Sequence, residues 1–263
     1  MTPAGLRDIC AAAAEAGASV LRDLYHHPRD VRFKGRIDLV TDADKASEET
    51  ILRVLRERAP GARILAEESG AHEGGELCFI VDPLDGTTNY AHGLPLFSCT
   101  VGAERAGQVV AGCTVDPLRG ETFVAARGLG AELRTAQGAQ PLRVSKAAEL
   151  VEALVCTGFP YGDRDKLPLM IAAFAKFTEL CRGSRRLGSA ALDLAYLAAG
   201  RLDGFWEMGL KPWDVAAGVV LVEEAGGTVT RFDGSPHRLA GGEMLAAPPP
   251  LHSRMVQVLT SGR

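Results

Sequence analysis

The chain has 263 residues, of which 46% are apolar and 24% charged, the balance of an ordinary globular protein. Its formal net charge of −4 gives no general attraction to nucleic acid or to an anionic membrane, so a site for an anionic ligand must be built locally with cations. The six cysteines form no Cys-x-x-Cys pair and no Cys/His cluster with zinc spacing, which excludes a structural zinc or a dithiol redox site.

The N-terminal segment is Ala-rich and has apolar residues at every third or fourth position between residues 6 and 24, which predicts an amphipathic helix. Charged residues interrupt the segment and argue against a secretory signal or a membrane span; they are Arg7, Asp8, Glu15, Arg22 and Asp23. Scattered thiols are typical of a reducing compartment, so we expect a cytoplasmic protein.

A second helix is predicted to begin near Thr41, with Asp44 as its reciprocal cap partner, and to end at about residue 59, before a Pro-Gly pair. Short apolar runs then predict strands at 63–66, 77–81, 97–103, 109–115 and 122–126. Several of these strands are joined by short turns, which favours antiparallel pairing over a series of βαβ units.

The second half of the chain mixes strands and helices. The predicted strands lie at 151–156, 202–206 and 228–231, and the predicted helices at 166–181, 190–199, 215–225 and 252–260. No repeat, low-complexity tract or long linker interrupts the sequence. We therefore expect a layered α+β architecture in one catalytic domain, residues 1–263, whose halves (about 1–145 and 146–263) share the active site.

The most informative stretch is 79–89, which reads FIVDPLDGTTN. An apolar strand runs directly into a turn that carries two carboxylates, Asp82 and Asp85, and Pro83 stiffens the backbone between them. Gly86 allows the turn, and the Thr-Thr-Asn that follows offers hydrogen-bond donors. Carboxylates for a hard cation beside donors for phosphate oxygens are what Mg²⁺-assisted phosphoryl transfer requires.

Acidic residues elsewhere in the chain fit the same site. Glu67 and Glu68 follow the predicted strand at 63–66, and if that strand pairs with 77–81, one of them lies near Asp82; a solvated pair of glutamates is the alternative. Asp214 opens a predicted helix, where an Asp is either a helix cap or a ligand.

Four separated motifs together resemble the inositol monophosphatase family. The motifs are DLVTDAD at 38–44, EES at 67–69, DPLDGTTN at 82–89 and WDVAAG at 213–218. They occur in the order and at the spacing of the family, and the likeness extends to TGFPY at 157–161 and GSA at 188–190. The resemblance implies the sugar phosphatase fold, a layered α-β-α-β-α sandwich with largely antiparallel or mixed sheets, and a homodimer that is sensitive to Li⁺.

The resemblance also implies two or three Mg²⁺ ions in the active site. The implied metal ligands are Glu67, Asp82, Leu84 (through its carbonyl), Asp85 and Asp214. Asp82 would bridge two ions about 3.5–4 Å apart, and Glu67 with Thr87 would orient the attacking water, with no covalent intermediate. The implied catalytic residues are Glu67, Thr87 and Asp85. The implied substrate-binding residues are Gly86, Thr87, Thr88, Gly188, Ser189, Ala190, Glu207 and Asp214.

The substrate side favours a monophosphate of a small polyol, with myo-inositol monophosphate as the first candidate. Glu207 matches the position at which the family binds a polyol hydroxyl, and segment 190–193 lacks the Lys that nucleotide bisphosphatases carry after a Gly-Ser-Ser. Fructose 1,6-bisphosphate and histidinol phosphate remain alternatives on the same fold. A non-catalytic regulator that binds protein or RNA is the alternative of a different class, although all four metal carboxylates are present.

Other residues receive structural interpretations. Asp193, in an apolar helix, is expected to pack at a subunit interface or to cap a neighbouring element. Arg182, Arg185 and Arg186 are expected to be solvated or to make interface contacts, with phosphate binding as the alternative. Asp44 is expected to act as a cap, with a place near a third ion as the alternative.

Overall fold

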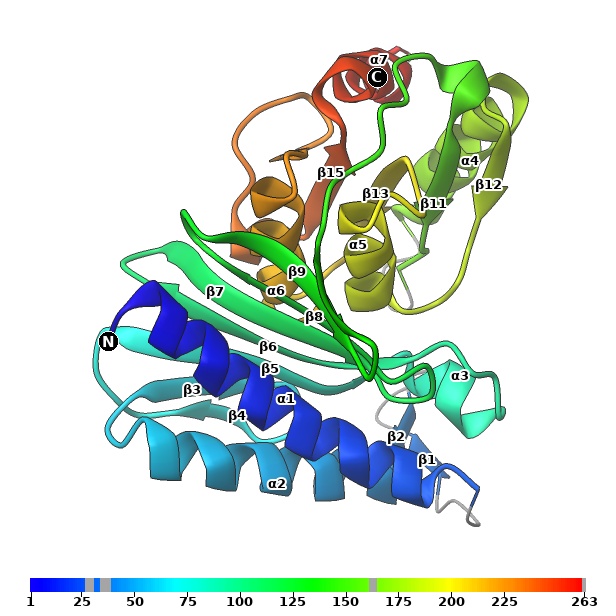
Figure 1. The fold of residues 1–263 in the computed structure, drawn as a ribbon. Coiled ribbons are helices and arrows are strands. Elements are labelled where there is room, and N and C mark those ends of the chain that lie inside the picture. Colours follow the sequence, from blue (N-terminus) through cyan, green and yellow to red (C-terminus); the bar gives the residue numbers. More distant parts are fainter. Residues whose placement is uncertain (27–30, 34–38, 161–164, 262–263) are drawn as a thin grey trace.

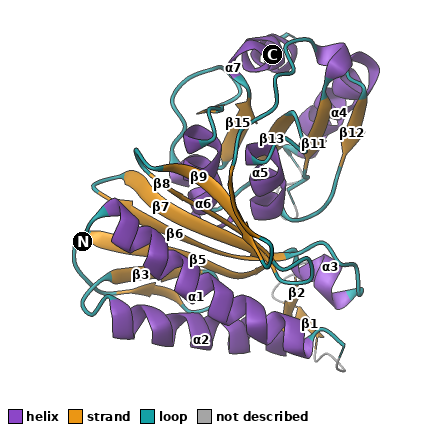
Figure 2. Cartoon of the chain, in the orientation of Figure 1, coloured by secondary structure: helices purple, strands orange, loops and turns teal. Residues whose placement is uncertain are grey.

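The structure, a computed structural model, describes residues 1–26, 31–33, 39–160 and 165–261. Its helices and strands form five layers, which Figures 1 and 2 show from one side. The α-helices are α1 (Pro3–Leu24), α2 (Asp42–Arg58), α3 (Thr87–Ala91), α4 (Leu167–Leu180), α5 (Ala190–Ala198), α6 (Pro212–Glu224) and α7 (Pro249–Thr260). Single 3₁₀ turns occur at Leu150–Glu152 and Leu239–Gly241.

A large sheet belongs to the N-terminal half, with strand order β10-β9-β8-β7-β6-β5-β3-β4. Its strands are β3 (Arg63–Ala66), β4 (Gly70–His72), β5 (Leu77–Asp85), β6 (Ser98–Arg105), β7 (Gln108–Asp116), β8 (Glu121–Ala126), β9 (Gly130–Thr135) and β10 (Gly138–Pro141). From β5 to β10 each strand pairs antiparallel with the next. A separate hairpin joins β1 (Val31–Phe33) and β2 (Leu39–Thr41).

A smaller sheet belongs to the C-terminal half, with strand order β12-β11-β13-β15-β14. Its strands are β11 (Leu154–Thr157), β12 (Gly183–Arg185), β13 (Gly204–Met208), β14 (Thr228–Thr230) and β15 (Glu243–Ala247). Strand β11 pairs parallel with both β12 and β13, whereas β15 pairs antiparallel with β13 and β14. This sheet is therefore mixed.

The helices fill the spaces between and outside the sheets. Helices α1 and α2 cover the outer face of the large sheet, α5 and α6 lie between the two sheets, and α4 and α7 cover the outer face of the small sheet (Figure 1). Three buried apolar clusters fill the four interfaces between layers, and one of them extends across both faces of the α5/α6 layer. This arrangement is the predicted α-β-α-β-α sandwich, and it brings the ends of β5, α5 and α6 to one region.

Two glycines let α6 approach the large sheet closely. A Cβ placed on Gly102 of β6 would lie 2.7 Å from Cβ of Ala216, and one on Gly112 of β7 would lie 2.6 Å from Cα of Ala217. Both distances are well below van der Waals contact, so the helix lies on the backbone of these strands. The N-terminus of α6, which carries Asp214, is thereby fixed relative to the sheet.

Some predicted elements differ from those in the structure. The strand predicted at 151–156 is a 3₁₀ turn followed by β11, and the helix predicted from residue 215 begins at Pro212. The expected antiparallel pairing is wrong for β3 with β5, which are parallel because β4 lies between them in the chain and pairs on the far edge of β3. Strands β1, β2, β4, β9, β10, β12 and β15 and the short helix α3 were not predicted.

The reciprocal cap predicted for the second helix is confirmed. The Thr41 backbone N–H donates to the Asp44 carboxylate at 2.8 Å, and the Asp44 N–H lies 3.4 Å from the Thr41 hydroxyl. Asp38 and Tyr161, which belong to motifs of the sequence, lie outside the described residues. Within the described ranges, no helix has the length and apolar character needed to cross a membrane.

Candidate active site

The first two acidic residues lie where β5 leaves the large sheet. The register of β5 with β6 shifts between Asp82 and Asp85, at Pro83, which has no N–H for the strand ladder. Asp82 is buried, and its carboxylate accepts a hydrogen bond from the Leu84 N–H at 3.0 Å. Gly86 then turns the chain into α3 with φ of +95°. The break in the ladder therefore exposes both carboxylates to one cavity.

Strand β3 brings a third acidic residue to the same place. It runs parallel to β5, and the Glu67 N–H donates to the carbonyl of Val81 at 3.1 Å, one residue before Asp82. Glu67 lines the cavity, whereas the backbone N–H of Glu68 donates to Glu48 of α2. The predicted pairing of these strands is confirmed, and Glu67 is the member of the pair that faces the site.

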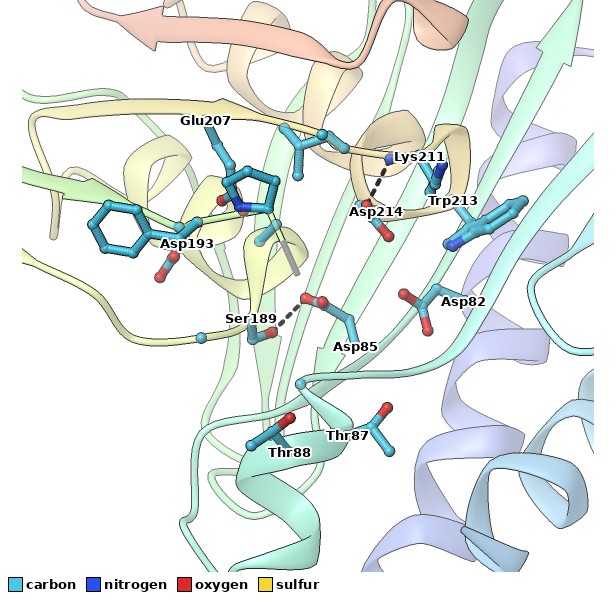
Figure 3. Close-up of a pocket in the computed structure, with 18 of the residues that line it drawn as sticks. Asp82, Asp85, Thr87, Thr88, Ser189, Asp193, Glu207, Lys211, Trp213 and Asp214 are labelled. Atoms are coloured by element: carbon cyan, nitrogen blue, oxygen red, sulfur yellow. Dashed lines mark hydrogen bonds between the residues drawn. The ribbon is translucent and has the colours of Figure 1, made fainter. Parts of the chain in front are cut away.

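The fourth acidic residue comes from the first turn of α6. The Asp214 carboxylate accepts a hydrogen bond from the Lys211 N–H at 2.7 Å and thus caps the helix. Asp214 also lines the cavity (Figure 3). The sequence had left a cap and a ligand as alternatives, and the geometry allows both roles for one carboxylate.

These residues surround a cavity of about 430 Å³ between the two halves of the chain. Its lining includes every residue that the sequence assigned to the site: Glu67, Asp82, Leu84, Asp85, Gly86, Thr87, Thr88, Gly188, Ser189, Ala190, Glu207 and Asp214. Residues 67–88 come from the large-sheet half and residues 188–214 from the small-sheet half. Neither half alone could form the cavity.

Three aspartates of the cavity, Asp82, Asp85 and Asp214, have pKa values above the ordinary value of an Asp. Burial raises the pKa of Asp82 well above its ordinary value, and the charges of Glu67, Asp85 and Asp214 raise it further. Burial likewise raises the pKa of Asp214, with Asp85 as the next cause. Crowding of like charges in a poorly hydrated site produces such shifts, and bound cations relieve them.

Asp85 is held by the N-terminal end of α5. Its carboxylate accepts a hydrogen bond from the Ser189 hydroxyl (Figure 3) and another from the Ala191 N–H at 2.8 Å. Burial raises the pKa of Asp85 to about 6, and these two hydrogen bonds limit the rise. A residue of the first half is thus positioned by a loop and helix of the second.

Thr87 connects the site to α2. Its hydroxyl lies 3.0 Å from the carbonyl oxygen of Leu84 and 3.2 Å from the carboxylate of Asp44. Asp44 is fully buried, so besides capping α2 it orients the Thr87 side chain. The capping interpretation of Asp44 is correct but incomplete.

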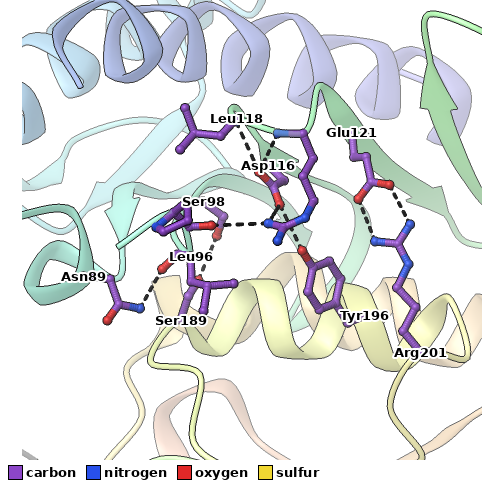
Figure 4. Close-up of polar contacts among 11 residues, drawn as sticks. Asn89, Leu96, Ser98, Asp116, Leu118, Glu121, Ser189, Tyr196 and Arg201 are labelled. Carbon is purple, nitrogen blue, oxygen red and sulfur yellow. Dashed lines mark hydrogen bonds and ion pairs between the residues drawn. The ribbon is translucent and has the colours of Figure 1, made fainter. Parts of the chain in front are cut away.

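Two sequence interpretations need correction. Asn89 was grouped with the donors for phosphate, but its amide nitrogen donates to the carbonyl of Leu96 at 2.7 Å (Figure 4). It also donates to the carbonyl of Leu187 at 2.7 Å, which ties the loop before α5 to the motif. Asp193 was expected at a subunit interface or as a cap, but it is buried and lines the cavity.

Further lining residues had no clear signal in the sequence. They are Thr157, Gly158, Phe159, Pro160, Lys166, Arg186, Met208, Gly209, Leu210, Lys211 and Trp213. Arg186 was expected to be solvated or at an interface, with phosphate binding as an alternative. Gly158, Phe159 and Pro160 follow β11 in a segment that resembles the family, but no spacing rule places such a loop in a pocket.

Comparison with known proteins identifies the family. The profile of the inositol monophosphatase family matches residues 6–261. The chain belongs to this family. It is therefore a phosphoric monoester hydrolase with the inositol monophosphatase fold, in a family whose members generally depend on a metal.

Individual relatives agree with this assignment. The chain is 42% identical over 253 residues to an inositol-1-monophosphatase of Synechocystis, covering 95% of this chain and 86% of the relative. It is 41% identical over 246 residues to Nus factor SuhB of Pasteurella multocida, covering 92% and 91%. The solved structure of an inositol monophosphatase from Anabaena superposes with a TM-score of 0.87 at 43% identity, covering 97% of this chain and 95% of that one.

Proposed function

We propose that this protein hydrolyses the phosphate monoester of a small polyol, with myo-inositol monophosphate as the first candidate, in a reaction that requires Mg²⁺. The observation that carries the proposal is the cavity in which Glu67, Asp82 and two further aspartates converge beside the backbone of Gly86 and Thr87. The oxygen-only donor set suits a hard cation. The family membership supplies the reaction class.

The proposed ligand sets use the residues at the ends of three elements. Glu67, Asp82 and the carbonyl of Leu84 would hold one ion. The second set is Asp82, Asp85 and Asp214. The raised pKa values of these aspartates fit the sets, because such carboxylates gain most from a bound cation.

The side chains of Asp82, Asp85 and Asp214 would have to move closer together to hold one ion. Among the described residues, no three His, Cys, Asp or Glu side chains are gathered closely enough to hold one ion. Mutual repulsion keeps uncompensated carboxylates apart, and we expect the three aspartates to draw together around a cation. When bound, Mg²⁺ would offset the carboxylate charge and polarise the phosphate oxygens and water.

The chain's own groups would then position the reactants. Glu67 and the Thr87 hydroxyl would orient the attacking water toward phosphorus, with Asp44 fixing the threonine at 3.2 Å. The N–H groups of Gly86 and Thr87, with the Thr88 side chain, would bind the phosphate oxygens. Such a direct in-line displacement needs no protein nucleophile, and catalysis rests on positioning and charge stabilisation.

The leaving alcohol would occupy the half of the cavity formed by the small-sheet half. Gly188, Ser189 and Ala190 line it on one side and Glu207 on the other. Burial raises the pKa of Glu207 well above its usual range, and the charge of Asp193 raises it further. A second phosphate would have to be buried beside these acids, which costs desolvation free energy and meets repulsion from either acid when it is ionised, and this favours monophosphates over fructose 1,6-bisphosphate.

A regulatory role is the second candidate, because a relative 41% identical to this chain is named Nus factor SuhB. Such a role would involve a macromolecular partner and would not need the four carboxylates of the cavity. The likeness to the family also leads us to propose a homodimer that Li⁺ inhibits. Assays of phosphate release from several phosphate esters distinguish the enzymatic function from a purely regulatory one.

The test is phosphate release from inositol 1-phosphate with Mg²⁺ and after chelation, for the wild type and Asp85→Asn. We expect activity only with Mg²⁺ and a loss of at least about 100-fold in the variant, because a charged ligand of the second proposed ion is removed. Inactivity on inositol 1-phosphate, fructose 1,6-bisphosphate, histidinol phosphate and adenosine bisphosphate would overturn the enzymatic proposal and favour the regulatory one.

A further inference from the structure

Asp193 is a buried acid in the cavity that the proposed chemistry does not use. It lies in the first turn of α5, two residues after Ala191, whose N–H binds Asp85, and only 1% of its surface is exposed. It lines the cavity (Figure 3), and its Oδ1 atom has no hydrogen-bond partner among the described residues. A buried carboxyl oxygen without a partner costs free energy, which a ligand that forms a hydrogen bond to it would offset.

The groups around Asp193 come from four elements. The Cys156 thiol of β11 and the charge of Arg186 both lower the pKa of this carboxyl, against the larger rise that burial causes. Asp85 lies on the metal side of the cavity and Glu207 on β13 faces the same space. Asp193 and Glu207 are thus two acids that flank the part of the cavity assigned to the leaving alcohol.

The carboxyl group of Glu207 lies close to the backbone of Gly158, in the loop after β11. A Cβ on Gly158 would lie 2.1 Å from Oε1 of Glu207, so the carboxyl rests directly against the loop after β11. The neighbouring Cys156 contacts Asp193 from the same strand. The C-terminal end of β11 and the loop after it therefore contact both acids. Packing against buried backbone fixes the two carboxyl groups, which are not a cluster of surface side chains.

The chemistry of the pair favours neutral hydroxyl groups. Burial raises the pKa of both Asp193 and Glu207, while Arg186 lowers both. A carboxyl that keeps its proton both donates and accepts one hydrogen bond, which matches a hydroxyl group. An anionic substituent would be repelled by the ionised form, and an ammonium group would be opposed by Arg186.

We propose that Asp193 is a specificity-determining residue that hydrogen-bonds one hydroxyl of the leaving alcohol while Glu207 binds a second. The pocket then selects monophosphates of polyols with two hydroxyls close together over esters that lack them. This inference rests on the proposed phosphatase function and specifies its substrate class. A site that hydrogen-bonds a substrate hydroxyl discriminates strongly against analogues without it, because its own buried group is left unpaired.

The test compares two substrates that share the phosphate chemistry. One is inositol 1-phosphate, and the other is p-nitrophenyl phosphate, whose leaving group has no free hydroxyl. We expect Asp193→Ala to lower kcat/KM for inositol 1-phosphate about 10- to 100-fold and to change it less than about threefold for p-nitrophenyl phosphate. Asp193→Asn, which keeps one acceptor, should fall between wild type and alanine.

Controls separate this role from a structural one. Tyr196→Phe, one turn further along α5, removes a hydroxyl that contacts Asp116 outside the cavity and should leave the ratio of the two kcat/KM values unchanged. The melting temperature and the Mg²⁺ concentration for half-maximal rate should match the wild type in Asp193→Asn. Free myo-inositol should inhibit p-nitrophenyl phosphate hydrolysis less strongly in Asp193→Ala.

Equal losses on both substrates would overturn the inference in favour of a structural role, and so would unchanged rates on both. A wild type that hydrolyses p-nitrophenyl phosphate but not inositol 1-phosphate would refute polyol selection while the phosphatase function stands. A wild type inactive on both would refute the proposed function itself. The two failures are therefore distinguishable.

Discussion

At the scale of single residues, the site depends on carboxylates whose charge is costly until a cation offsets it. Asp82 and Asp214 are buried beside other acids, and burial raises the pKa of both. The DPLD motif predicted that Asp82 and Asp85 lie together at one turn, and both line the cavity, because the motif itself fixes a turn with two acids. Asp193 could not be predicted, because one acid in an apolar helix gives no sign of whether its side chain faces a pocket or a neighbouring subunit.

A pH dependence of stability follows from Asp85. Its folded-state pKa of about 6 lies above the value near 3.9 of an unfolded Asp. The stabilisation is therefore complete below about pH 4 and is lost as the pH rises through about 6. Without divalent ions, we expect Asp85→Asn to reduce the fall in melting temperature between pH 5 and pH 7.5 by roughly 2–6 °C.

Thermal melting in a chelating buffer measures this effect. Asp23→Asn, at an exposed acid on α1, is the matched control and should melt with the same pH dependence as the wild type. If the melting temperature of Asp85→Asn falls with pH as steeply as that of the wild type, ionisation of Asp85 does not destabilise the folded protein.

At the scale of elements, the ends of helices and strands are determined by contacts between residues far apart in the chain, which local sequence patterns do not reveal. Continuous apolar runs predicted the long central strands β6, β7 and β8. No such run marks β12 (Gly183–Arg185), which is short and polar at the edge of its sheet, and β15 (Glu243–Ala247) is a short segment that begins with a buried acid. Parallel pairing of β3 with β5 depends on where β4 lies, which no local pattern reveals.

The close packing of α6 on the large sheet gives a second prediction. Gly112→Ala places a methyl group 2.6 Å from Cα of Ala217, so we expect a loss of about 1–3 kcal/mol in unfolding free energy. Phosphatase activity should fall as well, because displacement of α6 moves Asp214. Denaturant unfolding and phosphate release measure the two effects. Gly75→Ala, whose added Cβ would have its nearest neighbour at 3.6 Å, should change neither by much.

The amide of Asn89 gives a third prediction, since its bond to the Leu187 carbonyl joins the motif to the loop that carries Ser189. Asn89→Asp keeps the shape but cannot donate, and it places a negative charge against two carbonyl groups. We expect it to cost about 1–3 kcal/mol and to raise the Mg²⁺ concentration for half-maximal activity, because Ser189 no longer holds Asp85. A variant that is less stable but has the wild-type Mg²⁺ dependence would refute this link.

At the scale of the whole molecule, the active site exists because two halves meet. Buried Asp116 of β7 accepts hydrogen bonds from Arg119 at 2.9 Å and from Tyr196 of α5 at 3.0 Å, and Arg201 pairs with Glu121 at 2.6 Å (Figure 4). These contacts join the large sheet to α5 away from the cavity. The sequence motifs occur in both halves, so the residues that converge at the cavity could be proposed from the sequence. The remaining lining residues depend on how the two halves pack, which no local motif encodes.

The central claim is that the converging carboxylates form a Mg²⁺ site for phosphate ester hydrolysis, and Mg²⁺ binding to the unliganded protein tests it most directly. The measurement is calorimetric titration of Mg²⁺ at neutral pH, with phosphate release in parallel, for the wild type, Asp82→Asn and Asp116→Asn. We expect Mg²⁺ to bind the wild type and Asp116→Asn, whose altered acid lies outside the cavity, but to bind Asp82→Asn at least about 10-fold more weakly. Binding of equal strength and stoichiometry in all three proteins would contradict the account.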